Sequence, residues 1–260
     1  MIRIFKYSFY DLFRSRWSLF YFIFYLLITS GLLYLSGSES KVIITLMNVI
    51  LVLNPLISTI FGIMYFYNSR EFTELLLAQP VDRSKIFLGQ YLGLSSSLAL
   101  SFLLGVGLPF LLGGVLFSSE VLNFVVLLTV GLFLTFIFCA FSFWIALKFD
   151  HRIKGFGLAI LFWLFMAVIY DGILLLLIVT FSDYPLEKFA LITTVMNPID
   201  LSRILILLQL DISALMGYTG AVFNKFFGSH LGLVVASMSL IFWWAMPVWG
   251  MLRAGRKKDF

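Results

Sequence analysis

The run VLNFVVLLTVGLFLTFIFCAFSFWIAL, Val121–Leu147, contains no charged side chain. A helix needs about 20 apolar residues to cross about 30 Å of hydrocarbon, so the run is long enough to span a bilayer. A helix also satisfies its own backbone hydrogen bonds, as lipid requires. The run therefore predicts a transmembrane helix and an all-α fold.

Five further apolar runs have similar length: Trp17–Ser36, Val42–Tyr67, Ile86–Leu112, Phe156–Phe181 and His230–Leu252. Hydrophobic residues make up 62% of the chain and charged residues 12%, against about 45–50% and 25% in soluble domains. The mean hydropathy is +1.05. We therefore expect a polytopic membrane protein with six transmembrane helices.

The distribution of Lys and Arg predicts the orientation. Fourteen of the 18 lie in four groups: Arg3, Lys6, Arg14 and Arg16; Arg70, Arg83 and Lys85; Lys148, Arg152 and Lys154; Arg253, Arg256, Lys257 and Lys258. Short loops rich in Lys and Arg stay in the cytoplasm. Both termini are thus expected inside, in a multi-pass protein of the bacterial inner membrane. The net charge of +5 is attributed to these groups lying against anionic membrane lipid, and no nucleic-acid partner is expected.

We expect a single transmembrane domain, 1–260. Apolar and basic residues at helical spacing in 1–16 predict an interfacial helix. The first three spans follow in 17–112 and spans four and five in 121–181. Asn197-Pro198 predicts a helix start in the outer segment, 182–229, where we expect short helices resting on the outer surface. The sixth span, 230–252, precedes a cytoplasmic tail, 253–260.

The inner loop between the second and third spans, 68–85, holds alternating charges. Its first part predicts a short amphipathic helix with Phe72, Leu75 and Leu76 on one side and Glu71 and Glu74 on another. Gln79-Pro80 should end this helix, and Asp82 or Ser84 should cap the third span. Such a rigid projection suits a groove on a partner protein.

The string REFTELLLAQPVDRSKIFLGQYLG, Arg70–Gly93, resembles the corresponding loop of ABC-2 type transporter permeases. Phe72-Thr73 and Gln90 depart from the family pattern; Gln90 stands where Lys is common. The resemblance implies a homodimer that works with a separate cytoplasmic ABC ATPase, which holds the ATP and Mg²⁺. The residues at matching positions that it implies for ATPase coupling are Arg70, Glu71, Glu74, Leu76, Gln79, Pro80 and Arg83.

Within this family the chain is most similar to NosY-type permease subunits, which serve copper-site maturation of nitrous oxide reductase. The likeness lies in the inner loop, in Tyr170-Asp171, and in an outer motif of Asn197, Pro198, Ile199, Asp200 and Arg203. It implies a NosF-like ATPase and a NosD-like periplasmic β-helix partner that contacts Asn197, Pro198, Asp200 and Arg203. The alternative is an ABC-2 exporter of a lipid, peptide or drug-like solute.

The sequence lacks the motifs of an enzyme. The phosphate-binding pattern GxxxxGK[ST] is absent, and Gly250–Lys257 comes nearest but has Arg256 and Lys257 at the decisive positions. We find neither HExxH nor a nucleophile with a base. The two histidines, His151 and His230, are expected on opposite sides of the membrane. We therefore expect no catalytic residue, no metal site and no cofactor on this chain.

Asp171 lies within the fifth apolar run, where a carboxylate costs about 2.5–3.5 kcal/mol. Two interpretations are open: a proton or cation relay, or a structural hydrogen bond to Ser or Asn of a neighbouring helix. We expect no basic side chain at similar depth to pair with it. Asn54-Pro55 predicts a kink, and Gly89 with Gly93 predicts close helix packing, within one subunit or across a dimer.

Overall fold

The computed structural model describes residues 1–36, 38–114, 118–181, 184, 186–210 and 217–258. It is all-helical, with about 90% of the chain in helices and no strand in these described parts. The helices are α1 Ile2–Phe13, α2 Arg16–Leu35, α3 Glu39–Asn68, α4 Arg70–Leu77, α5 Arg83–Leu112, α6 Val121–Lys148, α7 Arg152–Leu164, the π-helix η2 Phe165–Ile169, α8 Tyr170–Thr180, α9 Glu187–Val195, α10 Pro198–Leu210 and α11 Gly217–Lys257.

Within the described residues, six helical segments are long and apolar enough to cross a membrane, as the sequence predicts. They are α2, α3, α5, α6, the continuous α7–η2–α8 segment (Arg152–Thr180), and His230–Lys257 of α11. Several of these helices are longer than the apolar runs in the sequence, because their backbone hydrogen bonding continues into the polar residues that flank each run. The clearest case is α11, which has 41 residues.

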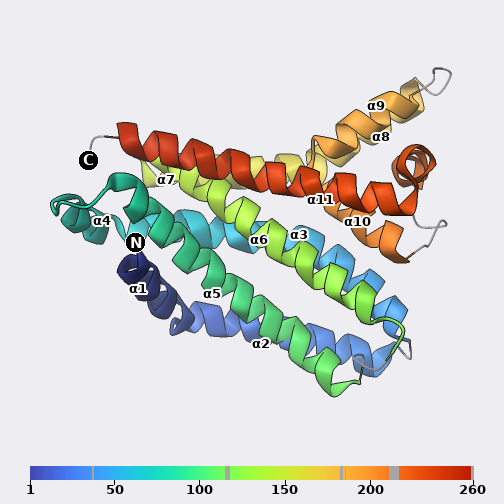
Figure 1. Cartoon of the computed structure of the whole chain (residues 1–260), viewed down its shortest axis with the longest axis horizontal. Coiled ribbons are helices and arrows are strands. Elements are labelled where there is room, and N and C mark those ends of the chain that lie inside the picture. The colour runs from blue at the N-terminus through green and yellow to red at the C-terminus, as the bar shows by residue number, and fades with distance from the viewer. Residues whose placement is uncertain (37, 115–117, 182–183, 185, 211–216, 259–260) are drawn as a thin grey trace.

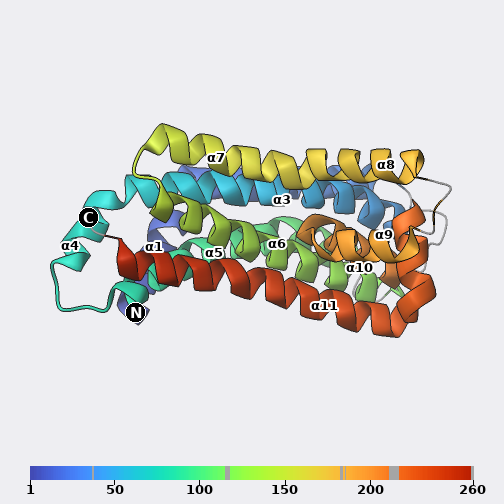
Figure 2. The ribbon, with the colours of Figure 1, turned by 90° about the horizontal axis from the view of Figure 1, so that it is seen from above.

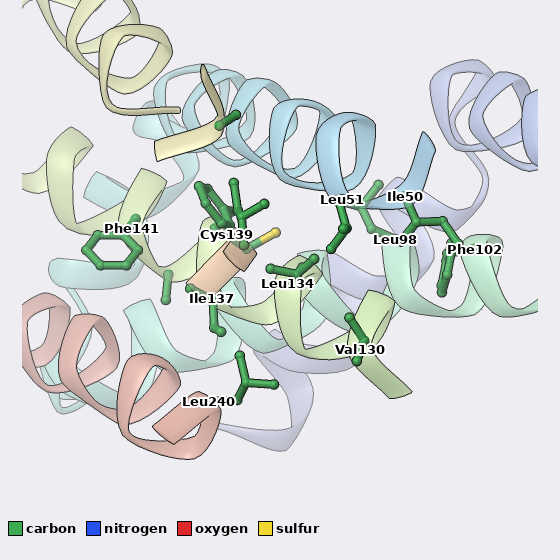
Figure 3. Close-up of a cluster of buried hydrophobic side chains, with 14 of the residues drawn as sticks. Ile50, Leu51, Leu98, Phe102, Val130, Leu134, Ile137, Cys139, Phe141 and Leu240 are labelled. Carbon is green, nitrogen blue, oxygen red and sulfur yellow. The ribbon is translucent and has the colours of Figure 1, made fainter. Parts of the chain in front are cut away.

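The centre of the bundle is α6, which packs against α3, α5, α10 and α11. The apolar stretches of α5 and α6 are about 67% and 61% buried within the chain, against 11% for the fifth span, α7–η2–α8. Figure 3 shows side chains from several helices meeting around α6, among them Val130, Leu134 and Ile137. Cys139 is fully buried in this cluster, in agreement with a packing role.

The N-terminal helix α1 packs along the first half of α5. Gly93 makes this approach possible, since a Cβ there would lie 2.6 Å from the Cβ of Ser8 and 3.0 Å from the carbonyl oxygen of Phe5. Ile4 lies against Gly89 in the same way. The Gly89–Gly93 pair therefore serves packing within one subunit.

Both termini lie at the same end of the bundle, beside α4 (Figures 1 and 2). Arg83 donates a hydrogen bond to the Lys258 carbonyl oxygen, and Lys258 forms an ion pair with Asp150, which follows α6. Arg256 donates a hydrogen bond to the Ser84 hydroxyl. The four basic groups of the sequence thus gather at one end, which we call the basic end.

The outer segment differs from the prediction. We expected short helices resting on the surface, and this is wrong for α10: ten of its 13 residues are buried, and it packs against α11, α6 and α3. It meets α9 at an angle of 109°, across a break at Met196-Asn197. Isoleucine and leucine cover most faces of α10, and a helix that is apolar on most faces is stable when buried among other helices. The polar residues Asp200 and Arg203 do not prevent this burial.

Candidate functional site

The inner loop folds as predicted into a short helix, α4, that projects from the basic end (Figures 1 and 2). It ends at Leu77, before Gln79-Pro80, and the Asp82 carboxylate accepts a hydrogen bond from the Ser84 backbone N–H to cap α5. The cap satisfies one of the orphan amides at the start of α5. Two defined breaks therefore fix the position of α4.

Contacts with α5 and α1 hold α4 in place. The buried Gln90 side chain of α5 donates a hydrogen bond of 2.9 Å to the Thr73 hydroxyl, and this hydroxyl donates to the Ser69 carbonyl oxygen. The ring of Phe72 stacks on Tyr7 of α1, with 4.6 Å between centroids. The sequence comparison marks Phe72-Thr73 and Gln90 only as departures from the ABC-2 pattern and does not predict the Gln90–Thr73 hydrogen bond.

The outward side of α4 carries Glu71, Glu74 and Leu75, all exposed. Arg70 and Glu74 form an ion pair of 2.9 Å, whereas Glu71 forms no ion pair with any described residue. Leu75 is 68% exposed, although the sequence pattern groups it with Phe72 and Leu76 on one side of the helix. The reason is helical register: at 3.6 residues per turn, Leu75 lies about 160° around the helix from Thr73, which takes the buried position.

The remaining predicted coupling residues surround α4. Leu76 is half-buried against the protein, and Gln79 and Pro80 are exposed in the turn that follows. Arg83 begins α5 and binds the Lys258 carbonyl oxygen at 2.8 Å. The neighbouring Lys258 ammonium lowers the pKa of the Asp150 carboxyl through a hydrogen bond and its charge. The structure thus brings the loop and the C-terminal tail together at one end.

A second cluster lies at the bend between α9 and α10. Arg203 of α10 forms ion pairs of 3.0 Å with Asp171 of α8 and with Asp200 of its own helix. The Asn197 amide donates to Asp200 at 3.2 Å. The expectation that no basic side chain pairs with Asp171 is therefore wrong, because α10 inserts into the bundle and carries Arg203 to it. A carboxylate in lipid needs such a partner.

Side chains of the fifth span and α11 stabilise the same bend. Tyr170 donates a hydrogen bond to the Thr193 carbonyl oxygen, and the Trp243 indole donates to that of Val195. These carbonyls belong to the last turn of α9, where the amides four residues on no longer continue the helix. Asn197 caps α10 by accepting from the Ile199 N–H, and it donates to the Met166 carbonyl oxygen inside η2. Hydrogen bonds from α8 and α11, and to η2, thus hold the bend between α9 and α10 in place.

The outer motif is therefore mostly internal. Asn197, Pro198 and Asp200 are buried, and Arg203 is half-buried and fully engaged with carboxylates. Any contact with an outer partner has to come from other residues of 182–229. The sequence signal that could have located the cluster is the spacing of Asp200 and Arg203, which share a face of α10 at i,i+3.

In the described part of the chain, no three His, Cys, Asp or Glu residues form a group that could hold a metal ion. No known protein-family model and no curated protein matches this sequence. The functional argument therefore rests on the residues themselves and on their geometry.

Proposed function

We propose that this chain is the membrane subunit of an ABC transporter of the ABC-2 type, and that it couples ATP hydrolysis on a separate chain to movement of its outer region. The subunit itself is non-catalytic. It works as a homodimer with a cytoplasmic ATPase that supplies the ATP and Mg²⁺ site. The basic end faces the cytoplasm, where short loops rich in Lys and Arg remain.

The observation that carries this proposal is α4. A short helix with an exposed leucine and exposed carboxylates projects from the basic end, and its opposite side is anchored to α1 and α5 by Phe72 and Thr73. An anchored projection of this kind transmits a displacement, whereas a free loop absorbs it. Its amphipathic surface suits a groove on the ATPase.

Hydrogen bonds connect α5 to the rest of the bundle. Tyr91 of α5 donates to the Phe136 carbonyl oxygen of α6, and Trp244 of α11 donates to the Tyr91 hydroxyl. Trp243, the preceding residue, binds the end of α9. A displacement of α4 and α5 thereby reaches α11 and the bend between α9 and α10.

The narrower proposal is a NosY-like role in copper-site maturation of nitrous oxide reductase, with a NosF-like ATPase and a NosD-like periplasmic partner. Its support is the sequence resemblance at Tyr170-Asp171 and at the outer motif, whose residues form one hydrogen-bonded cluster. The chain would then supply force to the partner and no copper ligands.

Export of an amphiphile is the second candidate function. It is favoured by an apolar groove of about 650 Å³ between α2 and α3, lined by residues such as Phe24, Leu53 and Ile57. A lipid or drug-like solute fits such a lining better than a charged peptide does.

The test is co-purification of an ATP-hydrolysing subunit with the tagged chain from its native membrane. Glu71→Arg with Glu74→Arg reverses both charges on the outward side of α4 and should abolish recovery of the ATPase. The loss of the Arg70–Glu74 pair costs α4 only about 0.5 kcal/mol. The matched control is Glu39→Arg with Glu187→Arg, two reversals at the other end, which should leave recovery intact. Undiminished recovery with the α4 variant would overturn the proposal.

A further inference from the structure

A pocket of about 320 Å³ lies at the basic end between α1, α2, α3 and the start of α4. Its wall is largely aromatic, with Tyr7, Trp17, Tyr65 and Phe72, and it holds one charged side chain, Asp11. Asp11 forms no ion pair with any described residue, although this end of the molecule is rich in Lys and Arg. The exposed Asp11 carboxylate therefore lies beside the aromatic rings of the pocket and is open to a ligand.

The pocket continues into the apolar groove between α2 and α3. Trp17, Phe61 and Met64 line both, and the Trp17 and Phe61 rings stand edge to face at 6.4 Å between centroids. The groove follows two membrane-spanning helices, so its long axis lies along the acyl chains of a surrounding bilayer. A polar pocket joined to an apolar groove matches an amphiphile with its head group at the basic end.

The charges around the pocket select the head group. Asp11 and Arg14 stand three residues apart on α1 and line a shallow hollow that adjoins the pocket. Residues at i and i+3 have Cβ atoms about 5–6 Å apart, so the carboxylate and the guanidinium stand close enough to bind the two charges of one zwitterionic head group. An ammonium gains from Asp11 and from the faces of the aromatic rings, and a phosphate gains from Arg14.

We propose that this pocket and groove bind one phospholipid with an ethanolamine head group, its ammonium at Asp11, its phosphate at Arg14 and an acyl chain in the groove. A primary ammonium donates hydrogen bonds to the Asp11 carboxylate and to the nearby Ser15 hydroxyl, which a trimethylammonium group cannot do. An anionic glycerol head group offers no cation to Asp11 and is repelled by it. This lipid site does not depend on the proposed ATPase coupling.

Trp17 reports occupancy, because it lines both the pocket and the groove. The chain is reconstituted in phosphatidylcholine vesicles containing an equal fraction of phosphatidylethanolamine, phosphatidylglycerol or phosphatidylcholine brominated near the head group. The Trp17 contribution to fluorescence quenching is obtained by difference from the Trp17→Phe variant. The ethanolamine lipid should quench it with an association constant about tenfold above those of the other two, as expected for one charge-assisted hydrogen bond.

Asp11→Asn should remove this preference while leaving the helix intact, since Asp11 has no ion pair to lose. Glu39→Gln makes the same change of charge at the other end of the bundle and should retain the preference. Equal quenching by the three lipids, a preference for phosphatidylglycerol or phosphatidylcholine, or an unchanged preference in Asp11→Asn would each overturn the proposal.

Discussion

Replacing Arg203 with methionine should destabilise the protein far more than replacing either carboxylate that it binds. Arg203→Met removes two ion pairs of 3.0 Å and leaves the Asp171 and Asp200 carboxyl groups side by side without a cation. Loss of one partner from a buried ion pair costs about 3–5 kcal/mol. The side chains of Arg203 and Asp171 are 35% and 27% exposed, so we expect the lower end, about 3 kcal/mol.

Asp171→Asn should behave differently. Arg203 keeps its pair with Asp200, and the cluster loses its excess negative charge. The expected cost is about 0.6 kcal/mol, the average for a hydrogen bond between membrane helices. If Asp171 is structural, the Asn variant also keeps its function, whereas a proton relay would lose function with normal stability.

The assay is unfolding in mixed micelles of increasing SDS fraction, followed by tryptophan fluorescence. The decisive variant combines Arg203→Met with Asp171→Asn and Asp200→Asn. Because it removes the two unpaired charges, it should recover stability to within about 1 kcal/mol of the unmodified protein. The reasoning would be refuted if Arg203→Met were as stable as the unmodified protein, or if the triple variant were no more stable than Arg203→Met.

Two further predictions concern the core and the topology. Asn54 accepts hydrogen bonds from Tyr21 and Tyr25 and donates to the Gly131 carbonyl oxygen, so Asn54→Leu should cost about 2–4 kcal/mol in the same assay by leaving both hydroxyls unpaired. Asn48→Leu, on the exposed side of the same helix, should change stability by less than about 0.5 kcal/mol, and equal costs would contradict the role of Asn54. In a Cys139→Ala background, Lys257→Cys should resist a membrane-impermeant thiol reagent in intact cells and react after lysis. Labelling in intact cells would place the basic end outside.

The sequence predicts the spans well because hydrophobic partitioning is a local property of each run. It also predicts both breaks around α4 and the start of α10, where the residues that decide the structure are adjacent: Gln79-Pro80, Asp82 and Asn197-Pro198. The structure at these positions depends on neighbouring residues in the sequence and not on the rest of the fold.

Long-range partners could not be predicted in this way. Asp171 and Arg203 are 32 residues apart, and their pairing depends on the insertion of α10, which hydropathy does not reveal. The sequence predicts only a kink at Asn54-Pro55, whereas the Asn54 side-chain amide makes four hydrogen bonds with residues of α2 and α6. The apolar pattern of α4 does not reveal that Thr73 takes the buried position and leaves Leu75 exposed, because this depends on Gln90, 17 residues away.

The most direct test of the central claim is photo-cross-linking from α4. Leu75, 68% exposed at the basic end, is replaced with p-benzoylphenylalanine, and Tyr34, 89% exposed at the other end, serves as the matched position. After irradiation of native membranes, position 75 should form a covalent adduct with an ATPase subunit that binds ATP, and position 34 should form none. Adducts of the ATPase from position 34 alone, or from neither position while the ATPase still co-purifies, would contradict coupling through α4.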